Sequence, residues 1–146
     1  MNLWFGNRIL GIRITNLQQV PVISIVDDDA SVREATKSLV RSLGYNAVTF
    51  ESAEEFLDST HVTGTSCLIT DVQMPGLNGV ELNDRLIADG HRLPVIFVTA
   101  FPDDRLQGRA LRAGAIGFLH KPFSEDHLIE CLSTALNGCD SEGTAQ

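Results

Sequence analysis

The chain has 146 residues and a formal net charge of −8, with 43% hydrophobic and 21% charged residues. This composition is typical of one soluble globular domain that is long enough to bury its own core. The acidic balance argues against a nucleic-acid-binding surface, which is usually basic, and no apolar run is long enough to span a membrane.

The cysteines and histidines show neither a metal cluster nor a disulfide framework. The three cysteines form no CxxC pair and are odd in number, and the four histidines are scattered along the chain. We therefore expect structural thiols in a reducing, cytoplasmic compartment and no metal site built from cysteine and histidine.

Residues 1–19 form an N-terminal extension whose structure the sequence leaves open. Leu3, Trp4 and Phe5 are apolar, but glycines, an asparagine and arginines interrupt the residues after them, so the segment is a poor signal peptide. A short extra strand or helix, a disordered arm and a misassigned start codon are all alternatives.

The first strand and helix are predicted directly after this extension. Residues 20–26 are apolar and mostly β-branched, which favours a strand buried on both faces, and Asp27-Asp28-Asp29 follow it. From Ala30 to Leu43 the apolar residues recur at helical spacing. Gly44 then suits the left-handed position that ends many helices.

A second strand is expected at residues 46–50, followed by a short helix from Ser52 to Asp58. Ser52 and Glu55 have the spacing of a capping box, in which the serine side chain bonds the backbone of Glu55 and the glutamate reaches back. This pattern predicts where the helix begins.

The apolar run at residues 67–70 is the third predicted strand. It ends in Asp71, and Met74-Pro75-Gly76 then turn the chain sharply. A carboxylate beside a packed core is costly without a partner, a metal or water. Asp71 therefore either caps the turn or has a function.

The rest of the chain repeats the alternation of helices and strands and ends in a polar tail, residues 139–146, which we expect to be disordered. The expected elements are a helix around 80–87, a strand at 94–100, a helix at 102–113, a strand at 115–120 and a helix at 124–137.

Five strands that alternate with five helices predict an α/β domain over residues 20–138, with one parallel sheet covered by helices on both faces. The crossovers are right-handed by default. In such sheets the functional crevice lies at the carboxyl ends of the strands.

The expected strand ends bring five polar residues to one edge of this sheet: Asp27, Asp28, Asp71, Thr99 and Lys121. Carboxylates packed this closely raise one another's pKa unless a cation lies among them, and oxygen ligands favour Mg²⁺. A metal, a carboxylate nucleophile and two further donors are together able to receive a phosphoryl group.

Several motifs surround these strand ends, and they make the chain similar to a known family. The motifs are Ile25-Val26-Asp27-Asp28-Asp29, Phe50-Glu51-Ser52-Ala53-Glu54-Glu55-Phe56-Leu57, Thr70-Asp71-Val72-Gln73-Met74-Pro75-Gly76, Val98-Thr99-Ala100, and Ala113-Gly114-Ala115 through Lys121-Pro122-Phe123. With these motifs the chain resembles response-regulator receiver domains (CheY-like), most of all the receivers of FixJ/NarL-type two-component regulators. This resemblance covers residues 20–138 and implies a doubly wound, flavodoxin-like sheet with strand order 2-1-3-4-5.

The resemblance implies a role for each carboxylate of the site. Asp71 would accept a phosphoryl group from a sensor histidine kinase or a phosphotransfer protein. Asp28, Asp71 and the backbone carbonyl of Gln73 would ligate Mg²⁺, with Asp27 acting through water. The chain would not be an enzyme, beyond slow self-dephosphorylation.

The resemblance also implies a switch. Lys121 and the Thr99 hydroxyl would bind the phosphoryl oxygens, and Phe118 would turn inward as Thr99 moves. The surface of the helix at 102–113 and the strand at 115–120 would then change shape, to bind a downstream protein or to form a homodimer.

Three neighbouring features complete these expectations. The Lys121-Pro122 bond is usually cis in the family. Gln73 and Phe101 stand two residues past Asp71 and Thr99, where side chains influence water access, and the large Phe101 is expected to slow hydrolysis of the phosphoryl group.

Three arginines share one face of the helix at 102–113 by their spacing: Arg105, Arg109 and Arg112. They form either a solvated face or a stripe that docks an acidic partner.

Other interpretations stay open from the sequence alone. FixJ/NarL-type regulators usually continue into a basic helix-turn-helix, whereas this sequence ends in a linker-like tail. We therefore expect either a stand-alone receiver or a fragment of a longer regulator. A receiver-like module that binds partners without phosphate is one alternative. Another is a haloacid-dehalogenase-type phosphatase, with Asp27 as nucleophile and Asp29 as acid and base. The phosphatase would leave Asp71, Thr99 and Lys121 unexplained.

Overall fold

The computed structural model describes residues 20–101 and 103–145, and side chains as far as Asn137. The expectations for residues 1–19 lie outside this part of the chain.

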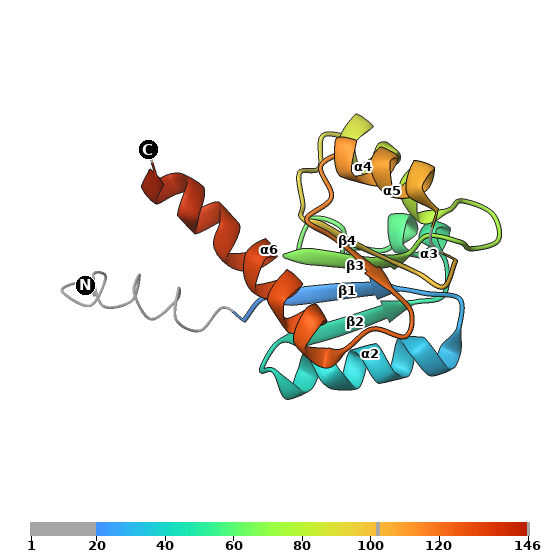
Figure 1. Ribbon diagram of the computed structural model, residues 1–146, viewed down its shortest axis with the longest axis horizontal. Helices are drawn as coiled ribbons and strands as arrows, with labels where there is room; N and C mark the ends of the chain where they lie inside the picture. Colours follow the sequence, from blue (N-terminus) through green and yellow to red (C-terminus); the bar gives the residue numbers. More distant parts are fainter. Residues whose placement is uncertain (1–19, 102, 146) are drawn as a thin grey trace, which may run out of the picture.

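One five-stranded parallel sheet forms the centre of the described chain, as the alternation of strands and helices predicts (Figure 1). Its strand order is β2-β1-β3-β4-β5, which confirms the expected order 2-1-3-4-5. The strands are β1 (Val22–Val26), β2 (Asn46–Phe50), β3 (Cys67–Asp71), β4 (Val95–Thr99) and β5 (Gly117–His120).

The two strands β3 and β4 lie inside the sheet and are buried along their whole length. Their sequences, CLITD and VIFVT, are nearly continuous apolar runs, because each face of a central parallel strand meets a layer of helices. Asp71 and Thr99 are the last residues of these strands, so the packing of the strands fixes the positions of both side chains.

In the part of the chain that the structure describes, five helices cover the two faces of the sheet. Helices α2 and α6 pack against one face, and α3, α4 and α5 pack against the other (Figure 1). Their bounds are α2 Ala30–Ser42, α3 Ala53–Asp58, α4 Gly79–Ala88, α5 Asp104–Arg112 and α6 Glu125–Ala145.

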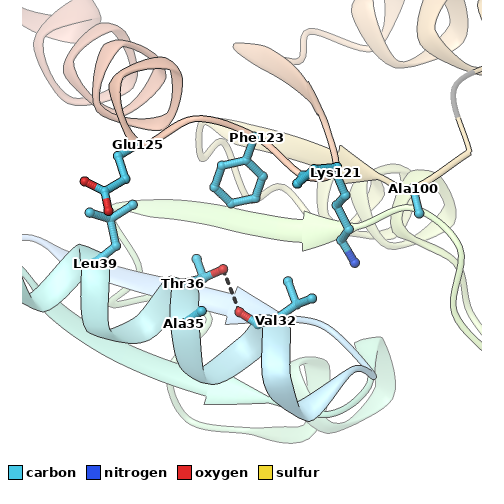
Figure 2. A pocket seen from close by; sticks show the side chains of 9 residues that line it. Val32, Ala35, Thr36, Leu39, Ala100, Lys121, Phe123 and Glu125 are labelled. Carbon is cyan, nitrogen blue, oxygen red and sulfur yellow. Dashed lines mark hydrogen bonds between the residues drawn. The ribbon is translucent and has the colours of Figure 1, made fainter.

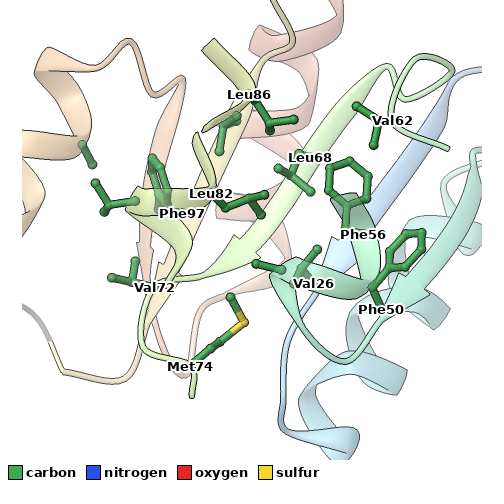
Figure 3. Packing of buried hydrophobic residues seen from close by; sticks show 14 residues of the cluster. Val26, Phe50, Phe56, Val62, Leu68, Val72, Met74, Leu82, Leu86 and Phe97 are labelled. Carbon is green, nitrogen blue, oxygen red and sulfur yellow. The ribbon is translucent and has the colours of Figure 1, made fainter. Parts of the chain in front are cut away.

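Each face of the sheet has its own apolar core. The core under α3, α4 and α5 includes Phe56, Leu82 and Phe97, all fully buried (Figure 3). The core under α2 and α6 includes Val40 and Leu128. Burial of a large apolar side chain stabilises a fold by about 1.5–3 kcal/mol, so these two layers hold the strand ends in place.

Two helix starts differ from the sequence expectation. Ser52 accepts the backbone N–H of Glu55 at 3.0 Å as predicted, but the Glu55 carboxylate reaches the N–H of Glu51 instead of that of Ser52. The reciprocal capping box lies on α4, between Asn78 and Glu81. This box was not predicted from the sequence, because the turn before α4 obscures where that helix begins.

The last helix is longer than expected. We expected it to end near Asn137 and residues 139–146 to be a disordered tail, whereas α6 continues to Ala145. The expected end is therefore wrong by eight residues. Gly138 alone does not stop a helix, and no proline follows it in the chain.

Within the described residues, no helix combines the length and the apolar character that a membrane crossing requires.

We predict that Gly79→Ala destabilises the protein. A Cβ atom at Gly79 would collide with the backbone carbonyl oxygen of Asp71, and backbone yields less easily than a side-chain tip. We expect the free energy of unfolding in urea to fall by about 1–3 kcal/mol. Gly64→Ala is the control, because a Cβ there meets nothing within 4 Å; it should stay within about 0.5 kcal/mol of wild type. Equal stability of the two variants would contradict the close approach.

Candidate functional site

The register of β1 and β3 brings two aspartates together at the carboxyl edge of the sheet. Val26 pairs with Thr70, so the next residues along each strand, Asp27 and Asp71, lie side by side. Both are buried, at 4% and 5% exposure, while the following residue, Asp28, is exposed. The Asp27 carboxylate also accepts the backbone N–H of Asp29 at 2.9 Å, which fixes its orientation.

Lys121 reaches these carboxylates from the end of β5. Its backbone N–H donates to the Thr99 carbonyl at 2.7 Å, which holds the residue beside the end of β4. Its ammonium lies 3.0 Å from Asp27 Oδ2 and 3.5 Å from Asp71 Oδ2. The Lys121-Pro122 peptide bond is cis, as the resemblance implied.

Three carboxylates converge at this point. Oxygen atoms of Asp27, Asp28 and Asp71 all lie within 4.8 Å of one another. Burial, and next the charge of Asp27, raise the pKa of Asp71 to about 6, although Lys121 acts in the opposite direction. Burial alone would lower the pKa of Lys121, but the Asp27 and Asp71 carboxylates raise it above its ordinary value.

The charges at this site are not balanced. Three carboxylates converge here, and among the described residues Lys121 is the cation whose ammonium pairs with them, through Asp27 and Asp71. Burial is the main cause of the raised pKa of Asp71, and the charge of Asp27 adds to it. The donors in the cluster are all carboxylate oxygens, one of them exposed, which suits a hard divalent cation such as Mg²⁺. Asp27, Asp28 and Asp71 are the residues that would hold such an ion.

The loop after β3 is tied to a neighbouring helix. The Glu54 carboxylate of α3 accepts the backbone N–H of Leu77 at 2.9 Å, and this hydrogen bond lowers the pKa of Glu54. Gly76, beside it, has a φ of +77°, a conformation that glycine adopts without strain. This hydrogen bond fixes the loop that follows Asp71 and leads into α4.

The Thr99 hydroxyl is the centre of a small hydrogen-bond cluster. It donates to Gln73 Oε1 at 2.6 Å and lies 3.2 Å from the carbonyl oxygen of Phe101. It also accepts the backbone N–H of Phe101 at 3.0 Å. Thr99 itself is fully buried, so this cluster joins the loop after β3 to the loop after β4.

The structure therefore gathers Asp27, Asp28, Asp71, Thr99 and Lys121 at one edge of the sheet, as the strand ends predicted. The contact between Gln73 and Thr99 was missed, because it joins residues 26 positions apart through a side chain. A polar residue two positions after Asp71 was the only signal for it in the sequence.

The remaining candidates lie on the α4 and α5 side of the sheet. Phe118 is partly buried, with its ring centroid 6.3 Å from that of Phe97. Phe101 is 71% exposed. Among the three arginines of α5, Arg109 forms an exposed ion pair with Asp84 of α4, at 2.8 Å. A docking stripe on α5 stays a prediction.

An apolar groove adjoins the site on the opposite face. It has a volume of about 480 Å³ and lies between α2 and the segment that links β5 to α6 (Figure 2). Ala35 and Leu39 line it from α2, and Phe123 lines it from the linking segment. Lys121 lines one end, so the groove and the carboxylate cluster share a residue.

Comparisons with known proteins agree with this geometry. Residues 23–133 match the family model of the response regulator receiver domain. The response regulator protein TmoT of Ectopseudomonas mendocina is 42% identical over 118 residues, which are 81% of this chain and 54% of that protein. The transcriptional regulatory protein FixJ of Bradyrhizobium diazoefficiens is 35% identical over 128 residues, 85% of this chain and 62% of that protein. The chain thus spans about half the length of the first of these relatives and somewhat more of the second.

Solved structures show the same fold. The response regulator StyR superposes with a TM-score of 0.78 at 38% identity, over 87% of this chain and 64% of that one. A response regulator receiver protein from Burkholderia phymatum has a TM-score of 0.70 at 44% identity, over 80% of this chain and 95% of that one.

We predict that Asp71→Asn stabilises the metal-free protein above pH 6. The pKa of Asp71 is raised from 3.8 to about 6, so its ionisation costs stability in the folded state. The neutral asparagine removes that cost, and the free energy of unfolding in urea with EDTA should rise by about 1–3 kcal/mol at pH 8. The gain should shrink as the pH falls from 6 to 4, where the wild-type carboxyl is protonated.

Asp29→Asn is the control for this measurement. Asp29 caps α2, and asparagine caps a helix equally well. The free energy of unfolding of the Asp29→Asn variant should therefore follow that of wild type at every pH. A stability gain in Asp71→Asn that does not change with pH would contradict the electrostatic origin.

Proposed function

The chain belongs to the family of response regulator receiver domains, and we propose that Asp71 accepts a phosphoryl group from a histidine kinase or a phosphotransfer protein. One observation carries this proposal: a buried carboxylate stands beside two further carboxylates, one ammonium and one threonine hydroxyl at the carboxyl edge of the sheet.

Each residue of the site has a defined part in the transfer. A carboxylate oxygen of Asp71 attacks the phosphorus atom of a phosphohistidine, forming an O–P bond as the P–N bond breaks. The bonding electron pair stays on the imidazole nitrogen, which takes up a proton. Asp28, Asp71 and the Gln73 backbone carbonyl would hold Mg²⁺, with Asp27 acting through water, and the ion would supply neutralisation of charge on the phosphoryl oxygens. Lys121 binds a phosphoryl oxygen through its ammonium.

The switch that accompanies phosphorylation involves Thr99 and Phe118. The phosphoryl group adds close to two negative charges and several acceptor oxygens. The Thr99 hydroxyl turns to donate to one of these oxygens, and Phe118 moves toward the space that is released. The surface of α5 and β5 then presents a different shape to a downstream protein or to a second copy of the chain.

The phosphatase alternative is disfavoured by the contacts of Asp29 and Asp27. Asp29, its proposed acid and base, caps α2 by accepting the backbone N–H groups of Ser31 and Val32. Asp27, its proposed nucleophile, has both carboxylate oxygens engaged, since Oδ1 accepts the backbone N–H of Asp29 at 2.9 Å and Oδ2 pairs with Lys121 at 3.0 Å. The phosphate-independent module is disfavoured by the complete set of five polar residues, which such a module would not need. We therefore infer a phosphoacceptor that turns over no separate substrate.

The apolar groove offers a docking surface for the phosphoryl donor. A donor protein must bring its phosphohistidine to Asp71, and so must contact the surface around the site. The groove between α2 and the segment after β5 is an apolar surface that continues from Lys121 (Figure 2). We infer that an apolar helix face of the donor packs there.

The free thiols of Cys67 and Cys131 suit a cytoplasmic setting.

We predict that a small-molecule phosphodonor labels the protein only when Mg²⁺ is present. Asp71→Asn should abolish the shifted band on a phosphate-affinity gel, because the nucleophile is lost. Asp29→Asn, which changes an aspartate outside the cluster, should be labelled like wild type. Labelling that survives Asp71→Asn but not Asp27→Asn would favour the phosphatase. Unlabelled but folded wild type would favour the phosphate-independent module.

We predict that Ala35→Asp slows transfer from a histidine-phosphorylated protein that labels wild type, by about tenfold or more, because it places a charge in the apolar groove. Labelling by the small-molecule donor should not change. Ser38→Asp adds the same charge to the same helix outside the groove and serves as the control. Equal rates for the two variants would place the donor elsewhere.

A further inference from the structure

The hydroxyl proton of Thr99 is already engaged in the resting protein. Its shortest contact is to Gln73 Oε1, at 2.6 Å, and the carbonyl oxygen of Phe101 lies farther away at 3.2 Å. A hydroxyl has one proton to donate, so the shorter contact takes most of it. A phosphoryl oxygen at Asp71 would have to compete with Gln73 for this proton.

Two contacts orient the Gln73 side chain. Gln73 Nε2 faces the Phe101 carbonyl oxygen at 3.5 Å, so the other end of the amide, Oε1, is presented to Thr99. The backbone N–H of Phe101 completes the arrangement by donating to the Thr99 hydroxyl at 3.0 Å. Gln73 is exposed whereas Thr99 is fully buried, which leaves Gln73 free to vary without disturbing the core.

We propose that Gln73 is a positioning residue that holds the Thr99 hydroxyl in its resting orientation and thereby opposes the switch. This inference rests on the proposed phosphoacceptor function and adds an element of regulation to it. The hydrogen bond between Gln73 and Thr99 stabilises the resting state alone, because the same proton bonds the phosphoryl oxygen in the switched state. Removal of the glutamine acceptor makes the switched state easier to reach.

The test uses beryllofluoride with Mg²⁺, a tetrahedral mimic of a phosphoryl group on a carboxylate, titrated by calorimetry. Gln73→Met keeps the length of the side chain and removes its acceptor. We expect it to bind beryllofluoride about 3- to 10-fold more tightly than wild type, the range that corresponds to the loss of one net hydrogen bond. Gln107→Met makes the same change on α5, away from the bonds of Thr99, and should bind like wild type.

A second background isolates the interaction with Thr99. In Thr99→Val the hydroxyl is absent, so adding Gln73→Met should change the affinity by less than about twofold. The methyl resonance of Thr99 supplies a spectroscopic readout without any ligand. It should shift in Gln73→Met, as the side chain leaves its resting rotamer, and should not shift in Gln107→Met.

The outcomes separate this inference from the function on which it rests. Binding by wild type with unchanged or weaker affinity in Gln73→Met would overturn the role of Gln73 and leave the phosphoacceptor function standing. The same tightening in the Thr99→Val background would also overturn it, because Gln73 would then act independently of the hydroxyl. Failure of folded wild type to bind beryllofluoride with Mg²⁺ would overturn both.

Discussion

The close approach of three carboxylates at one strand edge is the constraint on which the rest of this domain depends. Parallel pairing of β1 with β3 fixes Asp27 beside Asp71, and Asp28 comes directly after Asp27. Burial, and next the repulsion from Asp27, raise the pKa of Asp71 to about 6. A fold that keeps such a cluster must offset its cost elsewhere, because an unbalanced charge cluster opposes folding.

The offset comes from the two apolar layers on either side of the sheet. The cost at Asp71 amounts to at most about 3 kcal/mol for a pKa raised from 3.8 to about 6. Burial of one or two side chains such as Phe97 or Leu128 contributes that much. The domain therefore tolerates the cluster, and the excess negative charge becomes available for binding a cation. Stability and function are opposed at this edge of the sheet, since the arrangement that would bind a metal is the one that costs folding energy.

Most of the fold followed from local sequence signals, whereas parts of the site did not. The strands were predicted well because their apolar runs are short, β-branched and bounded by turn residues, as at β2 and β3. Asp71 and Thr99 were placed correctly because each directly ends such a run. The end of α6 was missed, since Gly138 is a weak stop signal. The bond between Gln73 and Thr99 was missed because two loops meet there through side chains, and no local pattern encodes that meeting.

The alternation of side chains along β4 explains why a change at Thr99 would bear on one layer of the domain and not on the other. Phe97 and Thr99 are two residues apart, so they point to the same face of the sheet. Phe97 lies in the core under α3, α4 and α5, and its register partner Phe118 packs against the same core. Val98, between them, faces the core under α2 and α6. A displacement of the Thr99 side chain would therefore act first on the pair of Phe97 and Phe118, which packs in the core under α5. The groove beside α2 is linked to Thr99 through Lys121, whose backbone N–H donates to the Thr99 carbonyl and not to its hydroxyl. The sheet thus separates the groove beside α2, where a phosphoryl donor would dock, from the surface of α5 and β5, whose shape would change on phosphorylation.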